Sequence, residues 1–252
     1  MAAQPHGEPP AVTDKLPLEQ AHLEALERMR LLEPYYRWTL QLFQPYLGQR
    51  VMDAGCGIGN FTAVLADNVA YTLAVDLSPL NIAVLKARFT ARAAVEVAQL
   101  DLERDIAALT QKRLDTIVCL DVLEHLEDDL GLLRSFRQVI QPGGYLCLKV
   151  PACPWLYGSV DVASSHYRRY TLRELAQKAT QTGWTPVQVR YTNIFGVLPY
   201  WLKSRVLKRS ANFSRTFAPW QLHLLQRTMP ILQVIDRLIG PPIGQSAILI
   251  AQ

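Results

Sequence analysis

Short, nearly continuous apolar runs alternate with helix-like stretches over most of the chain, and this alternation predicts an α/β protein. Strands that are apolar along their whole length are typical of a parallel sheet whose two faces are both covered by helices. Residues that favour turns separate the strands from the helical stretches. The expected strands are Arg50–Asp53, Tyr71–Asp76, Val95–Leu100, Leu114–Cys119, Tyr145–Val150, Pro186–Tyr191 and Ala247–Ala251.

Helical periodicity and boundary signals predict the helices before and between these strands. Pro79 occupies a favoured position at the start of a helix, and Thr171 with Glu174 has the spacing of a capping box. The expected helices are Leu18–Leu32, Tyr35–Tyr46, Pro79–Arg92, Arg104–Thr110, Asp128–Ile140 and Thr171–Thr182.

The same pattern divides the chain into four regions. Residues 1–17 are rich in Ala and Pro and are expected to form a flexible N-terminal arm, followed by helices in residues 18–47. Residues 48–195 and 241–252 hold the alternating strands and helices of the main domain. Residues 196–240 form a helical insertion before the last strand.

Composition narrows the class of protein. The chain has 252 residues, of which 50% are hydrophobic and 19% charged, so it can bury a large core. No apolar stretch is long enough for a transmembrane helix, and the N-terminus does not resemble a signal peptide. The four cysteines form no Cys-x-x-Cys pair, which favours a reduced, cytoplasmic protein over a disulfide scaffold or a structural zinc site.

A glycine-rich turn directly after the first strand is the most informative motif. Residues 51–60 read Val-Met-Asp-Ala-Gly-Cys-Gly-Ile-Gly-Asn, a Gly-x-Gly-x-Gly spacing that differs from the Gly-x-Gly-x-x-Gly of pyrophosphate-binding turns. The preceding Asp53 would repel a pyrophosphate but suits the cationic end of a ligand. Asp76 and Asp101 end the next two strands, where a carboxylate can bind ribose hydroxyls and an exocyclic amine, respectively.

These motifs resemble the class I S-adenosylmethionine-dependent methyltransferases over nearly the whole chain. The segment 115–125, the Pro-Gly-Gly turn in 133–144, and the segments 151–171 and 241–246 are similar to a type 11/type 12-like bacterial subgroup that acts on small molecules. The resemblance implies a Rossmann-like, seven-stranded, mostly parallel sheet with an antiparallel last strand. It also implies that residues 18–47 cover the cofactor site.

The resemblance implies a role for each residue of the cofactor site. Asp53 and the glycine turn would surround the methionine part, Asp76 the ribose, and Asp101 with Leu102 the adenine. Leu120 and Asp121 would close the pocket. The full set of expected cofactor-binding residues is Asp53, Gly55, Cys56, Gly57, Gly59, Asp76, Leu77, Asp101, Leu102, Leu120 and Asp121.

The segment after the fifth strand holds the candidate catalytic residues His166, Arg168 and Tyr170. His166 is the candidate general base, because imidazole titrates near neutral pH; capping of the next helix is its alternative role. Arg168 and Arg169 could bind an anionic substrate group, or one of them could pair with Asp161. Tyr157 and Tyr170 are expected to line the pocket.

A metal site is the less favoured interpretation of Glu124 and His125. Residues 121–125 are similar to the Glu-x-x-Glu-His of ubiquinone-pathway O-methyltransferases and small-RNA 3′-terminal 2′-O-methyltransferases, and carboxylates with imidazole can bind Mg²⁺ or Zn²⁺. This chain has the shorter Asp121 in place of the first Glu of that motif, and no second histidine pair follows. No metal is therefore expected.

Charge is distributed unevenly along the chain. Residues 1–174 hold 17 basic and 21 acidic residues, whereas residues 175–252 hold nine basic residues and only Asp236. In residues 196–240 the basic residues alternate with apolar ones, which suits a lid over the substrate pocket or weak contact of 197–240 with an anionic membrane surface. Nucleic acid is disfavoured, because the chain carries no recognised nucleic-acid-binding module.

Together these features predict an S-adenosylmethionine-dependent methyltransferase for a small-molecule or lipid-linked acceptor. O-methylation is favoured because of His166, with N- and C-methylation open. A non-catalytic S-adenosylmethionine-binding protein and an NAD(P)-dependent oxidoreductase are the alternatives, and the glycine spacing and Asp53 disfavour the latter. The expected location is the cytoplasm, with contact at the inner membrane surface.

Overall fold

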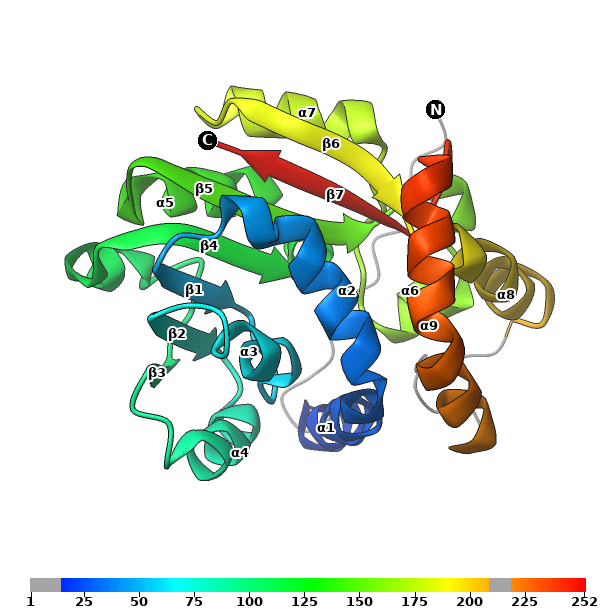
Figure 1. The fold of residues 1–252 in the computed structure, drawn as a ribbon, viewed down its shortest axis with the longest axis horizontal. Coiled ribbons are helices and arrows are strands. Elements are labelled where there is room, and N and C mark those ends of the chain that lie inside the picture. Colours follow the sequence, from blue (N-terminus) through cyan, green and yellow to red (C-terminus); the bar gives the residue numbers. More distant parts are fainter. Residues whose placement is uncertain (1–14, 209–218) are drawn as a thin grey trace.

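A seven-stranded sheet forms the centre of the computed structural model, which describes residues 15–208 and 219–252 (Figure 1). The strand order is β3-β2-β1-β4-β5-β7-β6. Neighbouring strands pair in parallel except for the last strand in sequence, β7, which is antiparallel to both β5 and β6. The predicted sheet with an antiparallel last strand is therefore confirmed. The strands are β1 (Arg50–Ala54), β2 (Tyr71–Asp76), β3 (Val95–Gln99), β4 (Leu114–Leu120), β5 (Ile140–Pro151), β6 (Pro186–Thr192) and β7 (Ser246–Ala251).

Helices cover both faces of this sheet, because both faces are apolar. On one face α2 (Glu33–Phe43), α3 (Asn60–Leu65) and α4 (Pro79–Phe89) bury aromatic and aliphatic side chains. On the other face lie the 3₁₀ helix η4 (Ile106–Lys112), α5 (Asp129–Val139) and α7 (Leu172–Gln181). Helix α1 (Lys15–Met29) and the 3₁₀ helices η2 (Arg30–Leu32) and η3 (Gln44–Tyr46) complete the N-terminal region.

Most predicted boundaries lie within two residues of the observed ones, but three differ by more. Helix α1 begins at Lys15 rather than Leu18. Residues 1–14, which make up most of the predicted arm, lie outside the described residues. Helix α4 ends at Phe89 rather than Arg92. Strand β5 begins at Ile140 rather than Tyr145, because Ile140 already pairs with Leu114 and a shift of register absorbs the Pro-Gly-Gly turn.

The strand order places β1 beside both β2 and β4, so the chain reverses its direction of progress across the sheet at this point. In open α/β sheets the crevice at the carboxyl ends of the strands at such a point is the usual ligand site. The glycine turn after β1 and the 3₁₀ helix η5 (Leu123–His125) after β4 both lie at this edge.

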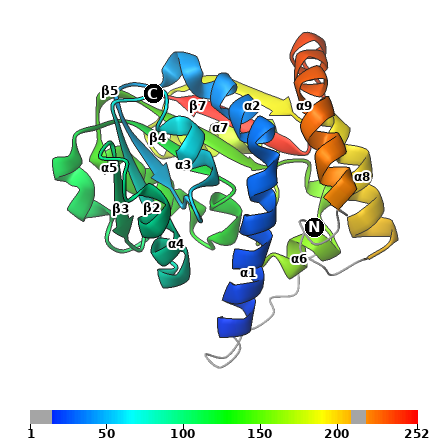
Figure 2. The same ribbon diagram turned by 60° about the horizontal axis from the view of Figure 1, so that its bottom comes forward.

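The predicted insertion forms the 3₁₀ helix η7 (Ile194–Gly196), α8 (Val197–Trp201), the π-helix η8 (Leu202–Val206) and the long helix α9 (Pro219–Ile239). Figures 1 and 2 show α9 beside α2 and α8 beside α9. Helix α9 continues through Pro230 and is not divided there. Among the described helices, none combines the length and the apolar character that crossing a membrane requires.

The buried carboxylate of Asp236 anchors α9 to the end of β6. It accepts hydrogen bonds from the Thr192 hydroxyl and the Ile194 backbone N–H, both at 3.0 Å, and Arg190 lies 3.6 Å away. Asp236 is fully buried, so these donors replace the water that its charge loses on folding.

Asp236→Ala should therefore destabilise the protein by about 2–4 kcal/mol, because it leaves buried donors without an acceptor. The free energy of unfolding can be measured by urea titration. The matched control is Asp67→Ala, which removes an exposed ion pair with Arg92 and should cost less than about 1 kcal/mol. Equal losses for the two variants would contradict the anchoring role.

Candidate active site

The glycine turn between β1 and α3 adopts a backbone that other residues rarely adopt. Gly55 has a φ of 72° and Gly59 a φ of 77°. A Cβ on Gly55 would lie 2.3 Å from the Val122 side chain, so the turn packs closely against the segment after β4. The Gly55 and Cys56 N–H groups both donate to the Val75 carbonyl at 2.9 Å, which fixes the turn against β2.

Asp76 at the end of β2 holds this turn in place. One carboxylate oxygen accepts from the Gly57 N–H at 2.8 Å, and the other accepts from the Ser78 N–H at 2.9 Å and the Asn81 side chain at 3.0 Å. A carboxylate has about four acceptor sites, so Asp76 keeps capacity for a ribose hydroxyl. The neighbouring Leu77 is exposed and available to a ligand.

Asp53 lies buried at the end of β1. Its carboxylate accepts one hydrogen bond, from the Thr62 hydroxyl at 2.6 Å. Burial raises the pKa of Asp53 to about 7, and the hydrogen bond from Thr62 opposes this rise only in part. A buried acid with one donor suits a ligand that brings a positive charge, as the methyl donor implied by the resemblance does.

The N-terminal helices approach the same turn. A Cβ on Gly57 would lie 3.1 Å from the Leu26 side chain of α1, and the Asn60 side chain donates to the Leu26 carbonyl at 2.8 Å. These contacts place the end of α1 directly against the glycine turn. Burial raises the pKa of the Cys56 thiol well above its usual value, so Cys56 is a packing residue of the turn rather than a nucleophile.

The remaining expected cofactor residues border the same edge of the sheet. Asp101 accepts from the Glu103 N–H at 2.9 Å, and Leu102 packs partly against the core. Leu120 packs against the cluster beneath α2 and α3. Asp121 has a φ of 53° and forms an ion pair with the Nζ of Lys149.

Lys149 is a site residue that the sequence reasoning missed. It lies buried in β5, and its ammonium group stands 5.4 Å from the centre of the Tyr35 ring on α2. The charge of Asp121 compensates for most of the cost of burying the Lys149 ammonium group. Burial lowers the pKa of Lys149, but Asp121 raises it above its usual range. The sequence signal that could have identified Lys149 is its position as a charged residue within an otherwise apolar strand.

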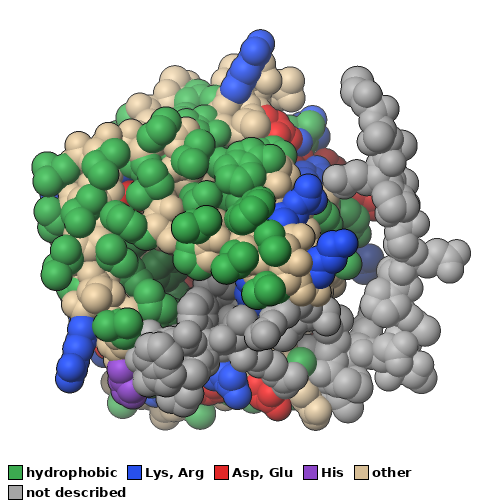
Figure 3. All heavy atoms as spheres, turned by 90° about the vertical axis from the view of Figure 1, so that its right-hand side faces the viewer, with side chains coloured by type: hydrophobic (Ala, Val, Ile, Leu, Met, Phe, Trp, Pro, Cys, Tyr) green, Lys and Arg blue, Asp and Glu red, His purple; other side chains and the backbone are tan. Residues whose placement is uncertain are grey.

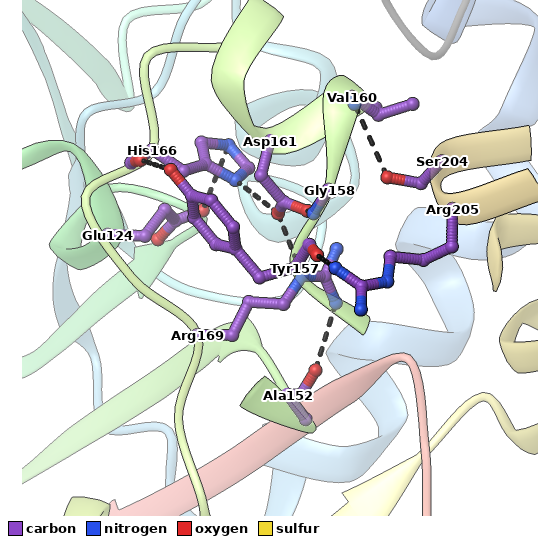
Figure 4. Close-up of polar contacts among 10 residues, drawn as sticks. All are labelled: Glu124, Ala152, Tyr157, Gly158, Val160, Asp161, His166, Arg169, Ser204 and Arg205. Carbon is purple, nitrogen blue, oxygen red and sulfur yellow. Dashed lines mark hydrogen bonds and ion pairs between the residues drawn. The ribbon is translucent and has the colours of Figure 1, made fainter. Parts of the chain in front are cut away.

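Asp161 on α6 (Ser159–Ala163) orients His166 (Figure 4). The His166 Nδ1 lies 3.0 Å from an Asp161 carboxylate oxygen, and Arg169 Nε donates to the same oxygen at 2.7 Å. Burial alone would raise the pKa of Asp161, but His166 and Arg169 together hold it below its usual value. An ionised Asp161 favours the proton on Nδ1 and leaves Nε2 as the acceptor.

The Nε2 side of His166 faces Glu124, whose carboxylate is fully buried. The distance from His166 Nε2 to a Glu124 carboxylate oxygen is 3.9 Å, and neither oxygen of Glu124 has a hydrogen-bond partner among the residues that the structure describes. Burial and the charge of Asp121 raise the pKa of Glu124 well above its usual value. The polar atoms of Glu124, His125 and His166 lie within 4.8 Å of one another, which is a spacing compatible with a cation.

Burial lowers the pKa of His125 to about 4, so its imidazole is neutral near neutral pH. The His125 and His166 rings meet edge to face at 4.7 Å. The side-chain polar atoms of Glu124, His125 and His166 thus converge just after β4, close in sequence to Val122, whose side chain lies against Gly55.

Arg168 and Tyr170, the other two expected catalytic residues, make their side-chain contacts with α5. Both contact Asp129 on α5: the Arg168 guanidinium lies 3.1 Å from its carboxylate, and the Tyr170 hydroxyl donates to it at 2.9 Å. Tyr170 is fully buried in the core. These contacts favour a positioning role for both. Tyr157, expected in the pocket wall, instead donates its hydroxyl to the His166 carbonyl at 2.7 Å.

Comparison with known proteins decides the family. The family model for a methyltransferase domain matches residues 25–189. The chain belongs to this methyltransferase family. The predicted family is thus confirmed, and the matched residues include the glycine turn, Asp76, Asp161 and His166.

Curated relatives of this methyltransferase domain are ubiquinone biosynthesis O-methyltransferases. The protein from Leptothrix cholodnii is 30% identical over 113 residues, covering 44% of this chain and 48% of that protein. The protein from Xanthomonas euvesicatoria is 31% identical over 129 residues, covering 51% of this chain and 52% of that protein. The chain therefore spans about half the length of these curated relatives.

Solved structures confirm the fold. A SAM-dependent methyltransferase from Archaeoglobus fulgidus superposes with a TM-score of 0.57 at 19% identity, covering 84% of this chain and 90% of that one. The insertion at residues 196–240 lies beyond the residues that the family model matches.

Replacing Asp53 with Asn should make stability less dependent on pH. Between about pH 4 and pH 7 the folded protein holds a proton on Asp53 that the unfolded chain releases, so stability falls as the pH rises through this range. Asn carries no charge and still accepts from Thr62. Asp53→Asn should therefore be more stable than the parent at about pH 8, by up to about 4 kcal/mol, and similar at about pH 4.

Urea titrations without added ligand at the two pH values test this expectation. Asp67→Asn, which alters an exposed carboxylate, is the control and should follow the parent at both. A gain for Asp53→Asn that is equal at both pH values would contradict the raised pKa.

Proposed function

We propose that this protein transfers the methyl group of S-adenosylmethionine to an oxygen atom of a small-molecule or lipid-linked acceptor in the cytoplasm. The observation that carries the proposal is the Asp161–His166 pair, which meets Glu124 and His125 in the segment after β4. Val122 of the same segment packs against Gly55 of the glycine turn. A histidine oriented through Nδ1 by an ionised carboxylate is suited to remove a proton with Nε2. A protein that only binds the cofactor has no need of such a pair.

In this proposal one group of residues binds the cofactor and a second group removes the proton from the acceptor. Asp53, Gly55, Gly57, Gly59 and Asp76 would hold S-adenosylmethionine, which when bound supplies a methyl group already activated on a sulfonium. His166 Nε2 would accept the proton of the acceptor hydroxyl. Asp161 would stabilise the resulting imidazolium, and Arg169 would keep Asp161 ionised and in place.

The relatives support transfer to oxygen, since their names describe O-methyltransferases in ubiquinone biosynthesis. The family match and Asp53 argue against the NAD(P)-dependent oxidoreductase. Alignment of the acceptor with the methyl group supplies much of the acceleration in such a reaction, and removal of the proton adds typically 10²–10⁴-fold.

Transfer assisted by a divalent cation is the second candidate. It is favoured by the buried Glu124 carboxylate, which lacks a hydrogen-bond partner and stands close to the nitrogens of His125 and His166. A cation would give Glu124 a direct ligand partner, which the charges of Lys149 and Arg169 do not replace because neither forms an ion pair with it among the described residues. The two candidates differ in their response to chelation: only the second requires that EDTA abolish turnover and that added Mg²⁺ or Zn²⁺ restore it.

Asp76→Ala should weaken S-adenosylmethionine binding by about 1.5–3 kcal/mol, or about 10- to 150-fold, because hydrogen bonds to a charged acceptor contribute that much. Titration calorimetry measures the affinity. Asp76→Asn, which keeps an acceptor for the Gly57 N–H, should lose less than the alanine variant if support of the turn contributes. Unchanged affinity in Asp76→Ala, or tight NADH binding by the parent, would overturn the assignment.

His166→Ala should lower turnover by 10²-fold or more and leave S-adenosylmethionine affinity unchanged, since His166 acts on the acceptor. The assay is release of S-adenosylhomocysteine across a panel of phenolic and polyprenyl-phenol acceptors. Asp161→Asn should also lower turnover, with a shift of the pH profile. His223→Ala, which alters a histidine exposed on α9, is the control. Full activity of His166→Ala at saturating acceptor would leave only a structural role for His166.

A further inference from the structure

The long helix α9 carries a second apolar stripe, on the side away from the protein. Leu224, Ile231, Val234 and Leu238 are spaced by seven, three and four residues and are 54% to 80% exposed. Met229 and Asp236 lie on the opposite side and are buried. Nine residues separate Leu238 from the buried Met229, which places the two side chains about half a turn apart on the helix, on opposite sides.

The neighbouring α8 and η8 extend this apolar surface. Leu198, Trp201 and Leu202 are 39% to 70% exposed, whereas Tyr200 and Ser204 on the inner side are buried. Figures 1 and 2 both show α8 beside α9. Figure 3 shows the resulting face, on which hydrophobic side chains form a broad continuous area with Lys and Arg at its margins. We call this face the α8–α9 surface.

Basic side chains dominate the charge of the α8–α9 surface. Arg205, Lys208, Arg227 and Arg237 are exposed. Asp236 is the only acidic residue of the insertion, and it is buried against β6. Lys203 is buried and therefore does not contribute; Arg209 and Arg215 lie outside the described residues.

A basic cavity lies at the margin of this surface. Its volume is about 410 Å³, and it is lined by Gly158, Ser159, Ser204, Arg205 and Lys208. Two hydroxyl-bearing residues and two cationic residues are the chemistry that recognises a phosphate group.

We propose that the α8–α9 surface docks on a bilayer that contains anionic phospholipids. Its apolar side chains would enter the interfacial layer, and its basic residues would lie among the lipid headgroups. Charge selects this partner: a second copy of the chain related by a two-fold axis would bring the same basic margins together and create repulsion. A large exposed apolar area marks an interaction site, and the basic margin requires that the partner be anionic.

The docking surface is connected directly to the segment that holds His166. Ser204 accepts from the Val160 N–H at 3.3 Å, and Arg205 donates to the Tyr157 carbonyl at 3.0 Å. Tyr157 in turn binds the His166 carbonyl (Figure 4). Docking would thus bring the bilayer next to the candidate base, which deepens the proposed function by favouring a lipid-linked acceptor.

Co-sedimentation of the full chain with vesicles tests the proposal without cofactor or acceptor. The vesicles are phosphatidylcholine alone, or phosphatidylcholine with about one third phosphatidylglycerol. Binding is expected only to the anionic vesicles, and it should weaken at least tenfold between about 0.1 M and about 1 M NaCl, as screening shortens the reach of the charges. Absence of binding at the lower salt concentration would overturn the proposal.

Variants separate the apolar from the charged contribution. Leu198→Glu with Leu238→Glu, and Arg205→Glu with Lys208→Glu, should each lower binding at least tenfold. The matched control is Val187→Glu, which places the same charge on an exposed apolar position of β6 and should bind as the parent does. Circular dichroism and S-adenosylmethionine affinity verify that each variant is folded.

Sedimentation velocity tests the alternative that the α8–α9 surface is an interface between two copies of the chain. If the parent forms a dimer that Leu198→Glu with Leu238→Glu dissociates, and vesicle binding is unaffected, the surface is an interface between copies and the proposal is wrong. Because vesicle binding is measured without methyl transfer, its failure leaves the proposed activity untouched, and an inactive protein that binds vesicles leaves the docking proposal intact.

Discussion

The buried carboxylate of Asp161 stabilises the segment after β5, residues 152–170. This segment holds the candidate base His166 and contacts η8 of the proposed docking surface. Asp161 accepts hydrogen bonds from the Gly158 N–H and Arg169, and it orients His166. Arg169 also donates to the Ala152 carbonyl at the end of β5, so the segment is tied back to the sheet. Without this charge, the candidate base would lose its orientation, and the contacts between this segment and η8 would lose their support.

The buried charges of this protein fall into two groups. Asp161, Asp236 and Lys149 have charged or hydrogen-bonding partners within the chain, and these partners compensate for the loss of water. Asp53 has one donor and Glu124 has none, and the pKa of each is raised by burial. Both residues of the second group lie at the carboxyl edge of the sheet. Incomplete compensation at this edge is what a site built to receive a cationic ligand requires.

The insertion gives the molecule a second exposed apolar surface, separate from the candidate active site. Helix α9 is apolar on two sides: one packs against the domain, where Asp236 anchors it, and the other lies open beside α8. The domain matched by the family model ends before this insertion. The catalytic chemistry and the proposed docking surface thus belong to different parts of the chain, and the contacts of η8 with residues 157–160 join them.

The sequence by itself determined the order of strands and helices, the glycine turn and the carboxylates at the strand ends. These features are local: apolar periodicity selects the element, glycine permits the positive φ of the turn, and parallel strands bring their carboxyl ends to one edge. The tertiary structure alone decided that Tyr170 and Arg168 meet at Asp129, that Lys203 is buried and that Leu238 is exposed. The spacing of apolar residues cannot tell which side of a helix with two apolar stripes faces the protein, because that choice depends on which neighbouring elements pack against it.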